Sequence, residues 1–162
     1  MSQLPVRQNA VIRGARRAYK SLLSLGLLSL LVACSGSPPD DLGIRQGRLS
    51  PCPASPNCVG SQDPDEAHRI APLPLAGSTE QTRNRLLEVL ASEPRTKVVE
   101  QRDDYLQVQF TSKVLRFVDD VEFLIGTQEV HVRSASRLGY ADFGVNRARI
   151  ERLRQRLSET KP

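Results

Sequence analysis

The chain has 162 residues, 39% of them hydrophobic and 25% charged, which suits one small folded domain better than two. Its formal net charge of +5 comes from 23 Lys and Arg against 18 Asp and Glu. Five of the basic residues and none of the acidic ones lie in the first 33 positions, so the rest of the chain carries no net charge. A neutral domain lacks the basic footprint of a nucleic-acid-binding domain, and we expect no nucleic-acid partner.

Residues 1–33 are typical of an export signal. Basic residues up to Lys20 precede an apolar run, Leu22–Ala33, which is too short for the roughly 20 residues that span a bilayer. The run ends in Leu31-Val32-Ala33-Cys34, which resembles the lipobox of bacterial lipoproteins. The resemblance implies cleavage before Cys34 and diacylation of its sulfur, which anchors a protein stably in a lipid bilayer. A transmembrane anchor is the weaker alternative.

The residue after the lipidated cysteine is Ser35 rather than the aspartate that retains many such proteins in the inner membrane. By resemblance to that sorting rule, we expect an outer-membrane lipoprotein that faces the periplasm.

Two further cysteines, Cys52 and Cys58, would then lie in an oxidising compartment, where a disulfide persists. Structural zinc needs four ligands, and no second Cys/His cluster is present. The spacing also differs from the C-x-x-C of redox dithiols. We therefore expect a Cys52–Cys58 disulfide, no metal site and no cofactor.

Composition divides the remaining chain into a tether and a domain. Residues 34–50 are rich in Ser, Gly, Pro and Asp, which predicts a flexible tether. We expect residues 51–158 to form a single globular domain, in which Gln62–Gly77 has loop character because of its prolines.

The regular elements follow in a simple order. A helix begins at Ser78 or Thr79, where Ser78 and Gln81 fit a capping box, and Pro94 ends it. Alternating or apolar runs then predict four strands and a last helix. The strands are Lys97–Arg102, Tyr105–Thr111, Val114–Ile125 and Gln128–Ala135, and the helix is Val145–Ser158. These elements predict an α+β fold, an antiparallel four-stranded β-meander with two helices on one face, preceded by the disulfide-bearing loop segment.

The last hairpin places an acid in the core. A two-residue turn at Gly126-Thr127 pairs Ile125 with Gln128 and puts Asp119 opposite Ser134. Side chains alternate along a strand, so Asp119 shares its face with apolar residues. These are Leu115, Phe117, Val121, Phe123 and Ile125. A buried carboxylate costs several kcal/mol unless it is paired, so partners are expected.

The last helix and the connection before it supply such partners. Asn146 continues the apolar stripe of the helix and should face the sheet, and Arg137 and Arg147 are the expected countercharges. The arginines also lie near a helix N-terminus, which favours anions. The candidate polar cluster, which either braces the fold or binds a small polar or anionic ligand, comprises Asp119, Ser134, Ser136, Arg137, Asp142, Asn146, Arg147 and Arg149.

The opposite face of the same hairpin carries complementary charges. The expected register puts Asp120 opposite Arg133 and Glu122 opposite His131. We interpret these as solvated surface pairs rather than as a metal site.

The chain resembles the uncharacterised bacterial and plastid proteins grouped as domain of unknown function 1499. The matching stretches are Cys52-Pro53, Pro56-Asn57-Cys58-Val59, Ser61-Gln62, Asp119-Asp120-Val121-Glu122-Phe123, Arg133-Ser134-Ala135-Ser136-Arg137, Gly139-Tyr140, Asp142, Gly144-Val145-Asn146-Arg147 and Arg149. Gly60 stands where a second serine is expected. The resemblance implies one domain and brings no established activity.

Two classes of function follow. The favoured one is a non-enzymatic, membrane-anchored envelope protein that is structural or ligand-binding. The alternative is a hydrolase-type envelope enzyme that uses Asp119 and Asp142 with Arg137 and Arg147. We assign no catalytic residue, because a Ser-His-Asp triad is disfavoured: His131 is expected on the face opposite Ser134.

Overall fold

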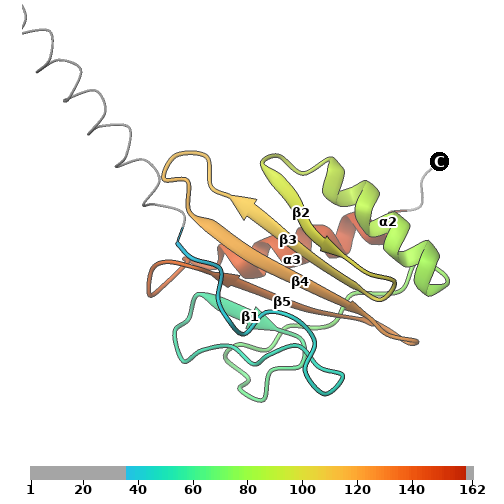
Figure 1. Ribbon diagram of the computed structural model, residues 1–162, viewed down its shortest axis with the longest axis horizontal. Helices are drawn as coiled ribbons and strands as arrows, with labels where there is room; N and C mark the ends of the chain where they lie inside the picture. The colour runs from blue at the N-terminus through green and yellow to red at the C-terminus, as the bar shows by residue number, and fades with distance from the viewer. Residues whose placement is uncertain (1–35, 160–162) are drawn as a thin grey trace, which may run out of the picture. The chain divides into compact units, whose positions relative to one another are not determined.

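The computed structural model describes residues 36–159, and Figure 1 shows their arrangement. The predicted export signal and the predicted lipidation site, Cys34, lie outside these residues. Within 36–159, no helix is long and apolar enough to cross a membrane.

One antiparallel sheet forms the centre of the fold, with strand order β1-β5-β4-β3-β2. The strands are β1 (Cys58–Gly60), β2 (Thr96–Gln101), β3 (Tyr105–Thr111), β4 (Val118–Ile125) and β5 (Val130–Ser136). The predicted α+β class and the meander are confirmed, but the expected four strands are wrong, because the sheet has five. The added strand β1 is only three residues long and pairs with β5, so it has too few residues to show a period-two pattern.

Two helices cover one face of the sheet (Figure 1). Helix α2 (Thr79–Ala91) has the predicted capping box, in which Ser78 and Gln81 bond to each other's backbone N–H. Helix α3 spans Val145–Ser158, as predicted. The buried side chains of both helices join those of the sheet in one hydrophobic core, which includes Leu86, Leu90, Val121, Phe123, Ile150 and Leu153.

The register of the last hairpin differs from the expectation by two residues. The turn holds four residues, 126–129, and Ile125 pairs with Val130 instead of Gln128. Asp119 consequently lies opposite Ser136, and Val121 lies opposite Ser134. Because an even shift keeps every side chain on its face, Asp119 still lies on the apolar face.

The N-terminal segment, residues 36–50, packs on the second face of the sheet. Leu49 is buried there against Tyr105 and Leu124, and Ile44 packs beside them. The structure thus differs from the flexible tether expected for these residues. Although the composition of this segment is typical of a loop, its apolar and charged contacts hold it on the sheet. The second face of the sheet is therefore covered as well.

Candidate functional site

The residues of the predicted polar cluster divide between the two faces of the sheet. Asp119 and Asp120 are neighbours on β4, so their side chains point to opposite faces. Arg149 of α3 reaches Asp119, whereas Arg137 reaches Asp120. The expectation that Arg137 and Arg147 pair with Asp119 is wrong. Arg137 and Arg147 were predicted because they lie near Asn146 in the sequence. Arg149 follows Asn146 by one helical turn, so it faces the sheet beside Asn146.

The first group, the helix-side cluster, lies between α3 and the sheet. It comprises Asp119, Ser134, Ser136, Asn146 and Arg149. The guanidinium of Arg149 pairs with Asp119, donates to Ser134 Oγ at 3.1 Å and to Asn146 Oδ1 at 2.6 Å, and stacks over Phe110 at 4.7 Å. Asn146 Nδ2 in turn donates to Ser136 Oγ at 3.0 Å. Asn146 is fully buried, as predicted.

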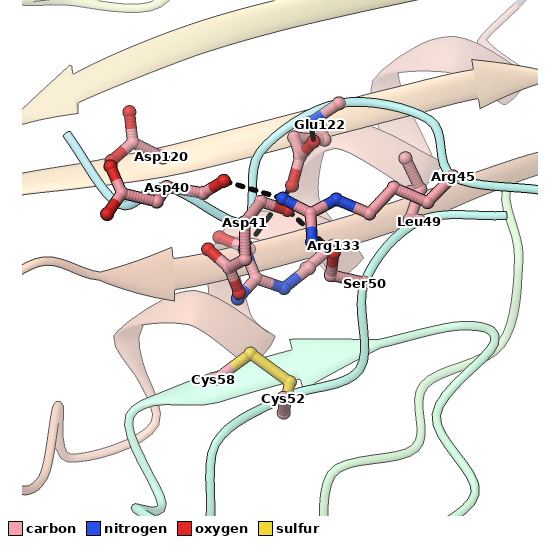
Figure 2. A network of polar contacts seen from close by, with 12 residues as sticks. Asp40, Asp41, Arg45, Leu49, Ser50, Cys52, Cys58, Asp120, Glu122 and Arg133 are labelled. Carbon is pink, nitrogen blue, oxygen red and sulfur yellow. Dashed lines mark hydrogen bonds and ion pairs between the residues drawn. A yellow bond between two sulfur atoms is a disulfide. The ribbon is translucent and has the colours of Figure 1, made fainter.

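The second group, the loop-side cluster, lies between the sheet and the N-terminal segment. It comprises Asp41, Asp120, Glu122, Arg133 and Arg137. Arg137 forms a bidentate pair with Asp120 at 2.6 and 2.8 Å. Arg133 lies between Glu122, at 3.3 Å, and Asp41, at 2.9 Å (Figure 2).

Glu122 has three kinds of donor around it. Its Oε1 accepts the backbone N–H of Gly43 at 2.7 Å and the hydroxyl of Tyr105 at 2.8 Å, and its Oε2 accepts from Arg133. Burial nevertheless raises the pKa of Glu122, because desolvation outweighs these donors and the positive charge of Arg133. Burial and the neighbouring Glu122 carboxylate likewise raise the pKa of Tyr105.

The expectation of solvated surface pairs on this face is wrong. Asp120, Glu122 and Arg133 are 1%, 0% and 3% exposed. The N-terminal segment, which composition alone did not place on the sheet, shields them from water. Among the described residues, no group of three or more His, Cys, Asp or Glu is arranged to hold a metal ion.

Asp142 and Arg147 lie outside both clusters. The carboxylate of Asp142 accepts the backbone N–H groups of Gly144 and Asn146, at 3.1 and 2.7 Å, and so caps the start of α3. Arg147 donates to the carbonyl oxygens of Arg69 and Ala67, at 2.9 and 3.3 Å. These contacts join α3 to the loop that follows β1.

A groove of about 290 Å³ opens between that loop, the disulfide segment and the start of α3. We call it the histidine groove. The predicted Cys52–Cys58 disulfide is confirmed (Figure 2). Its Cys58 lines the groove. The side chains that line the groove include Pro56, His68, Tyr140, Asp142 and Arg147.

His68 is the buried imidazole of this groove, 6% exposed. Its Nδ1 lies 2.9 Å from the carbonyl oxygen of Cys58. A carbonyl only accepts, so Nδ1 carries the hydrogen, and in the tautomer with a single ring hydrogen Nε2 is an acceptor. Within residues 36–159, the ring of His68 forms its hydrogen bond through Nδ1, and Nε2 has no partner. His68 is not among the residues predicted for the site, and its one signal in the sequence is that the chain has two histidines.

Comparison with known proteins gives one result. A family model described as "Protein of unknown function (DUF1499)" matches residues 48–157. The chain belongs to this family. No curated protein and no solved structure matches it. The DUF1499 match covers the helix-side cluster and the histidine groove, whereas Asp41 and Gly43, which close the loop-side cluster, precede it.

Proposed function

We propose that the chain is a lipid-anchored envelope protein whose domain binds a small polar or anionic ligand in the histidine groove. The anchor is Cys34 and the compartment is the periplasm, with the domain held at the outer membrane. The Cys52–Cys58 disulfide supports an exported protein, because such bonds persist in oxidising compartments.

In this proposal the two buried clusters brace the fold. Arg149 and Asp119 are 7% and 12% exposed at their side chains, and Arg137 and Asp120 are 6% and 1% exposed. A ligand would have to displace these pairs before it reached them. Breaking a buried pair costs about 3–5 kcal/mol, so a ligand site is disfavoured there.

No observation favours the alternative of a hydrolase that uses Asp119 with Asp142. Asp119 is paired with Arg149, and both carboxylate oxygens of Asp142 accept hydrogen bonds from backbone N–H groups. Neither carboxylate is left with the open surroundings that an acid–base pair needs.

The open Nε2 of His68 carries the binding proposal. The ring is held by the Cys58 carbonyl, so the acceptor is preorganised, and preorganisation lowers the entropic cost of binding. Arg147 adds a cation to the same groove. This combination suits a small ligand with hydroxyl or anionic groups.

The binding test compares the detergent-solubilised full chain with its His68→Asn variant. The Asn amide can keep a donor near the position of Nδ1 while Nε2 is lost. We expect inorganic phosphate or N-acetylglucosamine to shift the ring nitrogen resonances of His68 saturably in the wild-type chain. Calorimetric titration of both proteins should give an affinity about tenfold lower for His68→Asn. Saturable binding that His68→Asn leaves unchanged would contradict the proposal, and so would the absence of binding by both probes.

The anchor is tested separately by labelling cells with radioactive palmitate. We expect label on the wild-type chain and none on Cys34→Ser, which should move to the soluble fraction. A Cys34→Ser chain that stays membrane-bound would favour a transmembrane anchor instead.

A further inference from the structure

Exposed apolar side chains gather at one end of the sheet. Within residues 36–159, nine large hydrophobic side chains are exposed, and seven of them lie in the β3–β4 connection or at the β5–α3 connection. We call these seven the apolar rim: Val114, Leu115, Phe117, Leu138, Tyr140, Phe143 and Val145. Such a concentration on a small domain marks a site of contact with a partner or a membrane.

Phe143 shows how little the fold itself gains from the rim. Its backbone has a φ of +55°, a region that bulky residues rarely occupy. Its side chain is 96% exposed, so burial within the domain does not offset that cost. Val114, at 82% exposed, is similarly open to solvent.

The two connections lie side by side at the end of the sheet where β4 begins and β5 ends. Asp119 pairs with Ser136 there, and the backbone N–H of Arg137 donates to the Val118 carbonyl at 3.0 Å. Thr111, the last residue of β3, pairs with Val118. The rim is therefore one surface built from two loops.

The described chain begins at this same surface. Gly36 accepts a hydrogen bond from Arg137 Nη1 at 3.3 Å. A Cβ on Gly36 would lie 3.2 Å from the Leu138 side chain, so Gly36 is in contact with the rim. Figure 1 shows the start of the coloured chain near the β5–α3 connection.

Cys34 is two residues before Gly36, and two residues of extended chain span at most about 7 Å. An acyl anchor on Cys34 would hold the rim at the lipid surface. We propose, resting on the proposed anchor, that the apolar rim inserts into the interfacial region of the membrane that holds Cys34. The domain then lies on the bilayer in one orientation.

The composition of the rim supports a lipid occupant. Tyr140 and Phe143 are aromatic, and aromatic and leucine side chains are favoured at the membrane interface. The β3–β4 connection also carries Lys113 and Arg116 and no acidic residue over positions 112–117. These charges complement anionic lipid headgroups.

The test uses tryptophan as a depth reporter, because the chain has none. Full, lipidated Phe143→Trp is reconstituted into phosphatidylglycerol vesicles with and without brominated acyl chains. The matched control is Gln128→Trp, an exposed position in the β4–β5 turn at the other end of these strands. We expect a blue-shifted emission and at least about twofold stronger quenching at position 143 than at position 128.

The outcomes separate the rim from the anchor. If the chain binds vesicles but the emission is equal and solvent-like at both positions, the proposed insertion of the rim is wrong and the proposed acyl anchor is unaffected. Chain that carries no acyl group and does not bind vesicles would overturn both. Protection of position 143 in whole envelopes but not in vesicles would mean that a protein covers the rim, and would also overturn the proposal.

Discussion

Asp119 and Asp120 are adjacent in the chain, yet they pair with arginines on opposite faces of the sheet. Asp119 pairs with Arg149 of α3, and Asp120 pairs with Arg137, which also contacts the carbonyl of Gly36. Through these ion pairs, two adjacent residues hold α3 on one face of the sheet and contact the start of the described chain, through Arg137, on the other. The helix-side and loop-side clusters are therefore expected to contribute separately to stability.

Removal of one partner from the helix-side cluster should be severe. Asp119→Ala leaves the Arg149 guanidinium buried without its carboxylate, which costs about 3–5 kcal/mol in the free energy of unfolding. Urea unfolding measures this loss. The double variant Asp119→Leu with Arg149→Met should lose less than Asp119→Ala, because no buried charge is left alone. A loss below about 1 kcal/mol for Asp119→Ala would show that the pair does not brace α3.

Glu122 should make stability fall as pH rises. Its pKa is raised in the folded protein, so between the unfolded value near 4.5 and the folded value the native state binds more protons. Stability is therefore lost as pH rises through that window. Glu122→Gln cannot ionise, so the melting temperature of wild type relative to this variant should decrease from pH 4 upwards. A relative increase would contradict burial as the dominant cause.

Glu93 should behave in the opposite way. Burial by itself raises its pKa, but hydrogen bonds and charges from Arg152 and Arg156 outweigh it, so the pKa is lowered. The contribution of Glu93 is thus present above the unfolded pKa near 4.5 and is lost as pH falls through the folded value. Glu93→Gln should be less stable than wild type at pH 7, and thermal scans should show this gap closing on acidification. A gap that stays constant to pH 3 would rule out this linkage.

The disulfide should contribute modestly, because its loop is short. Cys52 and Cys58 are six residues apart, for which loop-closure entropy predicts about 2 kcal/mol. The double variant Cys52→Ser, Cys58→Ser should lower the melting temperature by several degrees in thermal scans. Dithiothreitol should lower the melting temperature of the wild-type protein by a similar amount and leave that of the variant unchanged. An equal effect of the reductant on both proteins would contradict the assignment.

Local patterns determined much of this fold from the sequence alone. The Ser78–Gln81 capping box, the alternation of β3 and the inward position of Asn146 depend on neighbours within a few residues. The placement of Asp119 on the apolar face depends only on the alternation of side chains along the strand. It was therefore predicted correctly although the predicted register was wrong by two residues.

Contacts between distant segments were decided only by the tertiary structure. Which arginine reaches Asp119 depends on how α3 lies across the sheet, and β1 exists because β5 offers it a free edge. One of the hydrogen-bond donors to Glu122 is the backbone N–H of Gly43, which is 79 positions away in the chain. Such contacts follow from how whole elements pack, and packing is not encoded in the local period of any one segment.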